Sequence, residues 1–374
     1  MRPLPKHREI YRALAAEIAD GQYDVHRRLP SEAQLVRRFG VSRPTAARAL
    51  RDLQLQGIVE RRVGAGSFIK TGGAKPSAGA EASRQLGLLL PGLEVTEIFE
   101  VFCGELASLT RANDYGLLWA GSSHARLRAD LSVKDAEAAC QHLIDRSVQG
   151  VFFAPFEFSS EMQRVSKRTV DQFKAAGIAV VLLDRDLVPF PFRSDLDLVA
   201  LDNVMAGYLA GEHLAKLGAK KIAFLARPLS APTIAARVAG AREALIAIGL
   251  EPAQNFLCVG EPRDESFVRE LIAGRKLEGI ICGNDFTAAQ LMHTFARLKI
   301  RVPEDIRLIA FDNLRYAELL AVPLTTVSQP YREMAANAMR AMLNRLADPT
   351  LPATALLSSP HLVVRSSCGA FLPR

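Results

Sequence analysis

Arginine side chains are concentrated in the first 70 residues of this 374-residue chain. This segment holds 14 Lys or Arg against 7 Asp or Glu, so it carries the whole net charge of +7 and the rest of the chain is neutral overall. A guanidinium group donates hydrogen bonds to phosphates and, in pairs, to the edge of a guanine. Because the excess of positive charge is confined to this segment, it indicates a polyanionic partner for this segment alone.

The elements that must position these arginines follow a helix-turn-helix pattern. Apolar residues spaced four apart predict a helix over residues 7–20. Ser31 with Gln34 three residues later forms a capping box that begins a second helix, and Gly40 supplies its C-terminal turn. Ser42 can cap a third helix whose apolar face includes Ala46, Ala49, Leu50 and Leu53. Residues 58–69 then alternate as in a β-hairpin, with the turn at residues 64–66.

The first turn of the third helix is Ser42-Arg43-Pro44-Thr45, and this part of a recognition helix meets base edges in the major groove. Arg43 can donate two hydrogen bonds to a guanine, and Thr45 suits a thymine edge or a phosphate. The other residues predicted to contact DNA are Ser31, Arg37, Arg38, Arg48, Arg61 and Arg62. Solvated surface charge is the alternative for any one arginine, but the cluster favours DNA binding.

A change of composition divides the chain. Residues 71–84 are rich in Gly, Ala and Ser and predict a flexible linker between a DNA-binding domain, 1–70, and a second domain, 85–374. Beyond the linker, continuous apolar runs alternate with helical stretches, as in parallel sheets covered on both faces. The predicted strands are residues 86–90, 116–120, 150–154, 178–183, 198–201, 221–226, 279–282, 306–311 and 362–364. This α/β pattern is long enough for two doubly wound lobes, with the first ending near Asp197 and the last segment crossing back.

Ligands of open parallel sheets bind where loops leave the carboxyl ends of the strands. Asp285 follows such a strand and opens a helix, so its carboxylate can accept hydrogen bonds from sugar hydroxyls at a cleft rim, or can instead cap the helix. Arg237 offers several donors in a fixed fork, and its alternative is a surface ion pair.

For the other residues considered as effector contacts, two roles remain possible. Glu157 can accept sugar hydroxyls or be a solvated loop acid, and Asp312 can line the cleft or cap a crossover between the lobes. Phe156 and Phe158 can stack on a sugar, although core packing is favoured for both. Trp119, in an apolar strand, is predicted to be core.

Two resemblances extend this interpretation. The segment LPSEAQLVRRFGVSRPTAARALRDLQLQGIVERRVGAGSFI resembles the winged helix of the GntR family, which implies base and phosphate contacts by Arg43 and Thr45. It also implies that the wing tip, Gly64 to Gly66, approaches the minor groove. The family often has arginine where Ala33 and Ala47 stand, so the operator sequence is expected to differ.

Residues 85–368 resemble the LacI/GalR sensor domains and their periplasmic sugar-binding relatives. The segments that carry this resemblance include LGLLLPG, VQGVFFAP, RPLSAPTIAARVAGAREAL, CGNDFTAAQLM, VPEDIRLIAFDN, PLTTVSQP and HLVVRSS. The combination of the two domains is similar to arabinose repressors. It implies a two-lobed sensor with Arg237 and Asp285 in its cleft, and a sugar effector that releases operator DNA. We expect a homodimer that reads two half-sites.

Several classes of protein fit poorly. No apolar run approaches the ~20 residues of a membrane span, and the charged start lacks a secretory signal. Five scattered cysteines indicate reduced thiols, so we expect a cytoplasmic protein. No catalytic or cofactor-binding motif is evident, so neither an enzyme nor a cofactor is expected. A purine or phosphorylated sugar as effector, or an effector acting as co-repressor, remains an alternative; a phosphate would favour a second arginine in the cleft beside Arg237.

Overall fold

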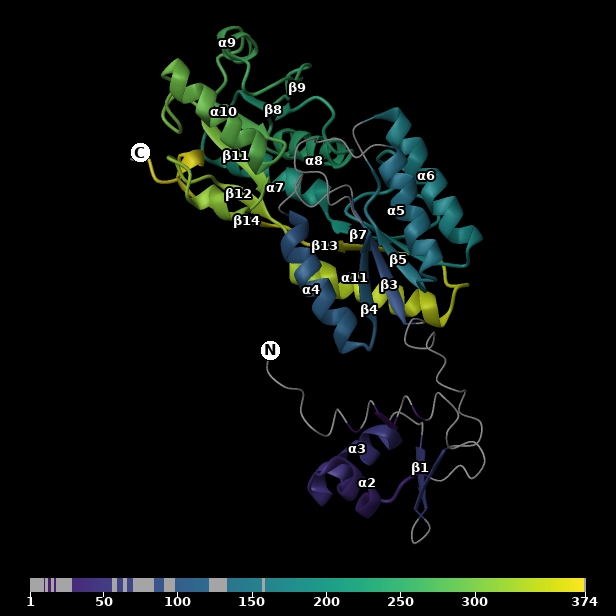
Figure 1. Ribbon diagram of the computed structural model, residues 1–374. Helices are drawn as coiled ribbons and strands as arrows, with labels where there is room; N and C mark the ends of the chain where they lie inside the picture. The colour runs from purple at the N-terminus through teal and green to yellow at the C-terminus, as the bar shows by residue number, and fades with distance from the viewer. Residues whose placement is uncertain are drawn as a thin grey trace. The chain divides into compact units, whose positions relative to one another are not determined.

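The computed structural model describes residues 10, 13, 14, 17, 29–55, 59–62, 66–69, 84–90, 98–120, 133–156 and 159–372. The chain divides into two compact units, Met1–Ser83 and Arg84–Arg374, each with its own hydrophobic core (Figure 1). The linker expected at residues 71–84 lies outside the described residues except for Arg84.

The first unit has the predicted helix-turn-helix followed by a hairpin. Its elements are α2 (Glu32–Phe39), α3 (Arg43–Leu55), β1 (Val59–Arg62) and β2 (Gly66–Ile69). The strands pair antiparallel with Val59 opposite Ile69. The buried core contains Leu35, Ala46, Ala49, Leu50 and Leu53, which confirms the apolar faces expected of the second and third helices. Ile10 and Leu14 also belong to this core, but most of the helix expected over residues 7–20 lies outside the described residues.

The second unit has two lobes, each with a six-stranded sheet (Figure 1). The strands of the first lobe are β3 (Gln85–Leu89), β4 (Gly116–Ala120), β5 (Gly150–Phe153), β6 (Ala179–Leu183), β7 (Asp197–Leu201) and β13 (Ala355–Ser358). They are parallel in the order β13-β7-β6-β5-β3-β4. Helices α4 (Ile98–Ala112) and α11 (Tyr331–Ala347) cover one face, and α5 (Val133–Asp145) and α6 (Ser160–Ala175) cover the other.

The second lobe repeats this plan. Its strands are β8 (Ile222–Ala226), β9 (Leu257–Val259), β10 (Gly279–Cys282), β11 (Arg307–Asp312), β12 (Thr326–Ser328) and β14 (His361–Val363), in the order β14-β12-β11-β10-β8-β9. Helices α7 (Asn203–Lys216) and α8 (Thr233–Ala247) pack on one face, and α9 (Glu265–Ala273) and α10 (Asp285–Leu298) on the other. Short 3-10 helices lie at Arg315–Glu318 and Ser366–Cys368. Strand β14 is antiparallel to β12, an exception to the predicted parallel pairing.

The chain passes between the lobes three times: after β7, between β12 and α11, and between β13 and β14. The chain therefore returns to the first lobe with α11 and β13, whereas the last segment, β14, lies in the second lobe, so the expected crossing back is confirmed for α11 and β13 but not for the last strand. The expected end of the first lobe near Asp197 was too early, because that residue begins β7, which completes the first sheet through Leu201. All nine predicted strands are present, whereas the short strands β9, β12 and β13 were missed.

Two aromatic residues test the expected core. Phe156 is buried with its ring 5.2 Å from that of Phe153, as predicted. Trp119 is not core: it lies on the edge strand β4 and is 42% exposed. An apolar sequence marks a strand but does not tell its place in the sheet, and only one side of an edge strand is covered by a neighbour. Among the described helices, none is long and apolar enough to cross a membrane.

Candidate functional site

The helix-turn-helix is held by local hydrogen bonds that the sequence specifies. Ser31 Oγ accepts from the backbone N–H of Gln34, and Gln34 Oε1 accepts from the N–H of Ser31, so both halves of the capping box are present. Gly40 ends α2 in the left-handed conformation with φ 61°. That conformation suits glycine and turns the chain directly into α3.

The first turn of α3 presents the residues expected to read DNA. The Arg43 side chain is 81% exposed, and its Nε lies 3.2 Å from Glu32 Oε2. Ser42 Oγ and Thr45 Oγ1 are 2.8 Å apart, which fixes both hydroxyls at the helix start. The Arg43 side chain is therefore accessible to a groove of DNA, and the Glu32 carboxylate orients it.

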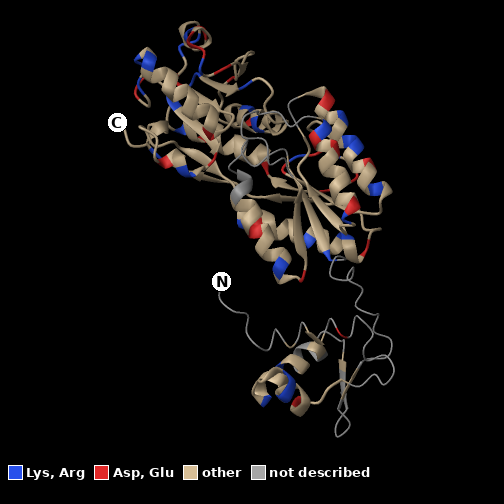
Figure 2. Cartoon of the chain, in the orientation of Figure 1, with Lys and Arg blue, Asp and Glu red and all other residues tan. Residues whose placement is uncertain are grey.

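Figure 2 shows basic residues on α2 and α3 of this unit. Their surroundings differ. Arg37 and Arg48 are exposed on α2 and α3. Arg38 instead pairs with Glu17 and stacks on the Phe39 ring, so part of its charge is neutralised within the unit. Arg61 and Arg62 lie on β1, and Gly66 begins β2; Gly64 lies outside the described residues.

In the second unit, acidic residues end the central strands of both lobes. Asp184 directly follows β6 of the first lobe with φ 66°, and Asp312 ends β11 of the second lobe with φ 110°. Positive φ is strained for a residue with a side chain, and such strain concentrates at functional sites. Arg185, next to Asp184, is also buried, with its Nη2 3.5 Å from Asp184 Oδ2.

Arg237 connects these groups. It lies on α8, where its Nε donates to Asn203 Oδ1 at 2.9 Å and its Nη1 donates to the carbonyl of Gly283 at 2.7 Å. Its Nη2 is 3.8 Å from Asp312 Oδ1, and its guanidinium lies 4.6 Å from the centre of the Phe311 ring. The surface ion pair considered for Arg237 is wrong, because both partners are buried.

The charges of these four residues influence one another. Burial raises the pKa of Asp184 to about 6, with Arg237 opposing and Asp312 adding to the shift. Burial also raises the pKa of Asp312, against the influence of Arg237. Burial and then the charge of Arg237 lower the pKa of Arg185 to about 9. We call Asp184, Arg185, Arg237 and Asp312 the interlobe cluster.

Asp312 also contacts the crossover into α11. Its Oδ1 accepts from Gln329 Nε2 at 2.8 Å, and its carbonyl accepts from the Tyr331 hydroxyl at 3.0 Å. Both alternatives weighed for Asp312 therefore have structural support: it belongs to the cluster and it also holds a crossover.

Asp285 is completely buried and both of its carboxylate oxygens have protein donors. Oδ2 accepts from the N–H of Leu314 at 2.8 Å, and Oδ1 accepts from the Thr326 hydroxyl at 2.6 Å. It does not cap α10, because Asn284 does so by accepting from the N–H of Thr287. Burial, with the charge of Asp312, raises the pKa of Asp285 to about 8. An effector contact by Asp285 stays a prediction, and Glu157 lies outside the described residues.

The sequence interpretation missed Asp184 and Arg185. Their signal was present, since an acid and a base follow the predicted strand 178–183 as Asp285 follows 279–282. Nothing in the sequence showed that the carboxyl ends of β6 and β11 approach one another.

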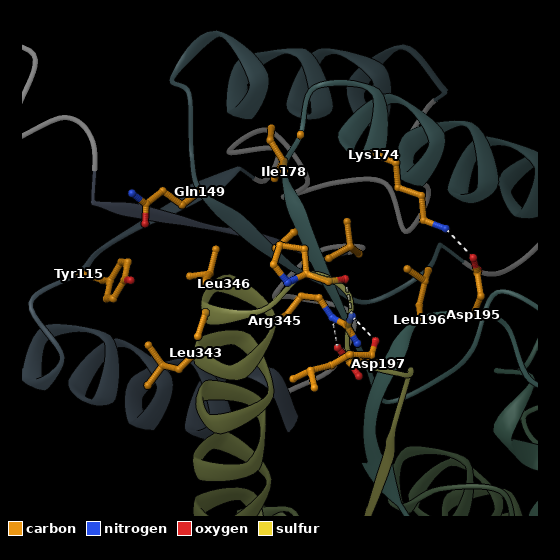
Figure 3. Close-up of a pocket in the computed structure, with 16 residues that line it drawn as sticks. Tyr115, Gln149, Lys174, Ile178, Asp195, Leu196, Asp197, Leu343, Arg345 and Leu346 are labelled. Atoms are coloured by element: carbon orange, nitrogen blue, oxygen red, sulfur yellow. Dashed lines mark hydrogen bonds and ion pairs between the residues drawn. The ribbon is translucent and has the colours of Figure 1, made fainter.

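A separate groove of about 910 Å³ lies at the opposite, amino-terminal end of the first sheet, beside the C-terminal end of α11 (Figure 3). Its charged side chains are paired: Arg345 donates to Asp197 at 2.9 Å and Lys174 to Asp195 at 3.0 Å. Because ligands of open parallel sheets bind at the carboxyl ends, we do not assign the effector to this groove.

Comparison with known proteins assigns a domain type to each unit. Residues 6–69 match the bacterial regulatory proteins of the gntR family, and residues 212–368 match the periplasmic binding protein-like domain. The chain joins a gntR-type domain to a periplasmic binding protein-like domain. Both resemblances seen in the sequence are thereby confirmed, whereas the likeness to arabinose repressors stays a prediction.

The sequence relatives are bacterial transcription regulators. The repressor PurR of Mannheimia succiniciproducens is 32% identical over 47% of this chain and 54% of its own length. The regulator DegA of Bacillus subtilis is 29% identical over 74% of this chain and 79% of its own. The ribose operon repressor of Escherichia coli is 29% identical over 47% of this chain and 55% of its own. The chain spans only 54% to 68% of the length of the three PurR repressors compared.

Solved structures share the fold. The complex of the regulator CelR with cellobiose is 20% identical with a TM-score of 0.65, covering 87% of this chain and 91% of CelR. The regulator CcpA of Lactococcus lactis is 20% identical with a TM-score of 0.63, covering 76% of this chain and 99% of CcpA. The chain thus shares its fold with these two structures.

Proposed function

We propose that this protein is a sequence-specific transcription regulator, a repressor that a small neutral sugar releases from operator DNA. The observation that carries the proposal is the pairing, in one chain, of an exposed arginine, Arg43, at the start of the second helix of a helix-turn-helix with the interlobe cluster of charged side chains. Most of the sequence relatives are named as repressors, among them PurR and the ribose operon repressor, which supports regulation as the activity. We further propose that the chain is not an enzyme, needs no cofactor and acts in the cytoplasm.

The DNA-binding role rests on the first unit. The exposed Arg43 stands at the start of α3, and the whole net charge of the chain lies in residues 1–70. We propose that Arg43 and Thr45 contact bases and that Arg37, Arg48, Arg61 and Arg62 contact phosphates. Ser31, Arg38 and Ser42 support or add to these contacts, and Gly64 and Gly66 bring the wing to the minor groove.

The effector role rests on the interlobe cluster. Its two arginines each lie beside an aspartate, so its formal charge is balanced. Alternating donors and acceptors suit the hydroxyls of a neutral sugar, each of which both donates and accepts. A phosphate needs an excess of cations, and although Arg185 supplies a second arginine, the two aspartates cancel it. We therefore propose Arg237, Asp312, Asp184, Arg185 and Glu157 as effector contacts.

Asp285 has a different role in this proposal. Because both of its oxygens already accept hydrogen bonds from Leu314 and Thr326, it holds the loop that follows Asp312. An effector reaches Asp285 only by displacing one of these donors.

Coupling requires two copies. Dimerisation through the second unit would place two winged helices at two half-sites, and a sugar that binds one lobe arrangement better than the other shifts the DNA affinity by that difference. If the effector acted as a co-repressor, its binding would raise the DNA affinity instead of lowering it. A purine effector is the second candidate, supported by the names of the PurR relatives.

The test is a DNA-binding titration. Operator sequences are selected from a random DNA pool with the full-length protein, and affinity is then measured with and without pentoses, hexoses, their phosphates and purines. We expect a neutral sugar to weaken operator binding. Weakening by a phosphorylated sugar or a purine alone would reject the sugar proposal, and the absence of any selected sequence would reject the regulator proposal.

A further inference from the structure

The guanidinium of Arg237 has three nitrogens, and hydrogen bonds within the protein hold two of them. Nε donates to Asn203 Oδ1 at 2.9 Å, and Nη1 donates to the carbonyl of Gly283 at 2.7 Å. Within the described part of the chain, Nη2 makes no hydrogen bond and lies 3.8 Å from Asp312 Oδ1. Nη2 is therefore the nitrogen that remains for an effector, and Asn203 and Gly283 decide where it points.

Asn203 occupies the first crossing between the two lobes. Leu201 ends β7 of the first lobe and Asn203 begins α7 of the second lobe, with only Asp202 between them. The Asn203 side chain is buried, and its Nδ2 donates to the carbonyl oxygen of Leu201 at 3.1 Å. Because an arginine can only donate, Nε of Arg237 requires the amide oxygen of Asn203 and leaves the amide nitrogen for Leu201. One side chain thus joins Arg237 to the strand that leaves the first lobe.

The main chain of Arg237 also contacts α7. A Cβ on Gly207, in the second turn of α7, would lie 1.9 Å from the carbonyl oxygen of Arg237, so the two helices are in direct contact here. Both the main chain and the side chain of Arg237 therefore touch the helix that begins at the crossing. A shift of Arg237 toward a bound molecule must either move α7 or break the hydrogen bond to Asn203.

We propose that Asn203 is a positioning residue, which aims Arg237 at the effector and transmits the contact between the effector and Arg237 to the first crossing. This inference rests on the proposed effector role of Arg237 and names the residue that couples it to the movement of the lobes. A buried arginine that loses an acceptor is left with an unsatisfied donor. Removal of the Asn203 amide should therefore weaken effector binding, whereas loss of the bond to Leu201 alone should weaken the effect on DNA affinity.

Two substitutions separate these contacts. Asn203→Ala removes both of them. Asn203→Asp keeps an oxygen for Arg237 Nε but replaces the donor to Leu201 by a second acceptor, which then faces a carbonyl oxygen. Asp202→Asn is the matched control in the same crossing, because Asp202 caps α7 by accepting from the N–H of Met205 at 2.9 Å and asparagine can do the same.

The experiment uses the full-length protein and a panel of ribose, xylose, glucose, galactose and hypoxanthine. Thermal shift on the parent selects the compound that stabilises it most, and calorimetry measures the affinity of each variant for that compound at about pH 8, where a carboxyl beside an arginine is ionised. Fluorescence anisotropy then gives the response, which is the ratio of operator affinities without the compound and at a saturating concentration of it.

The variants should differ in kind. Asn203→Ala should bind the compound at least tenfold more weakly than the parent. Asn203→Asp should bind it within threefold of the parent but show a response at least threefold smaller. A residue needed only for folding would not separate affinity from response in this way. Asp202→Asn should match the parent in both measurements.

The outcomes separate this proposal from the proposed function. If Asn203→Ala does not fold, Asn203→Ser takes its place, with a loss of at least threefold in affinity expected. Parent-like affinity in a folded Asn203→Ala or Asn203→Ser overturns the proposal and leaves the proposed function standing. So does an undiminished response or a tenfold loss of affinity in Asn203→Asp. Failure of the parent to bind any compound of the panel overturns the effector role of Arg237 and this proposal with it.

Discussion

Arg237 Nη2 lies 3.8 Å from Asp312 Oδ1, and both side chains are buried at the junction of the two lobes. The arginine belongs to α8 and the aspartate ends β11, so the pair ties a helix to the strand end that faces the first lobe. A buried ion pair adds little net stability compared with apolar packing, and buried charges with shifted pKa values are typical of functional sites, which agrees with the effector contacts proposed for both residues.

Replacement of Arg237 should lower the free energy of unfolding. Arg237→Ala leaves Asp312 buried without its cation, and we expect a loss of ~3–5 kcal/mol in the free energy of unfolding. Asp312→Asn in the same background should recover part of that loss, because no charge then remains unpaired. Urea denaturation measures both. A loss below ~1 kcal/mol for Arg237→Ala would mean that water solvates Asp312.

The pH dependence of stability should depend on Asp285. Its folded pKa of about 8 exceeds its ordinary value of 3.8, so the folded state holds a proton that the unfolded state has lost. The stabilisation is complete below pH ~4 and is lost as pH rises through about 8, by up to ~1.4 kcal/mol per pH unit for one proton.

Asp285→Asn tests this assignment. The amide imitates the protonated acid, since its oxygen accepts from Leu314 N–H and its nitrogen donates to the Thr326 hydroxyl. We expect the decline in unfolding free energy between pH 5 and pH 8 to be shallower in this variant than in the parent. Because the charge of Asp312 raises the pKa of Asp285, the two carboxyls influence each other, and the difference between the curves reports Asp285 together with its effect on Asp312. Parallel curves would show that Asp285 is ionised throughout.

Two glycines set the distance between α7 and α8. A Cβ on Gly240 would lie 1.8 Å from the carbonyl oxygen of Val204, and one on Gly207 would lie 1.9 Å from that of Arg237. Gly240→Ala should therefore separate the helices and lower the thermal midpoint, at a cost of ~1–3 kcal/mol or more. Gly104→Ala in α4 meets no atom within 4 Å and should stabilise that helix by ~0.5–1 kcal/mol. Equal midpoints for the two variants would contradict the close approach.

Arg43 should distinguish base contact from phosphate contact. Arg43→Ala should lower operator affinity by ~1–3 kcal/mol and relax the preference at one base pair. Arg37→Ala should weaken operator and random DNA about equally and reduce the salt dependence by roughly one ion. Fluorescence anisotropy on both DNAs at several salt concentrations measures this. Equal losses on operator and random DNA for Arg43→Ala would restrict it to phosphate.

The sequence by itself determined the local architecture. The capping box at Ser31, the turn at Gly40 and the apolar strands depend only on residues that are close together in the sequence. Such features form through short-range hydrogen bonds and through burial of an apolar run. The concentration of positive charge in residues 1–70 could also be determined without a structure. The fold of the first unit was therefore predictable, whereas its candidate DNA contacts stay predictions.

Only the tertiary structure decided what meets at the cleft. Asp184 with Arg185, Arg237 and Asp312 come from three distant segments, and their approach depends on the three crossings that set one sheet against the other. The same packing buried Asp285 against Thr326 and left Trp119 at a sheet edge. Periodicity in a sequence tells how one element faces the core, but it carries no information about which strand ends are brought together.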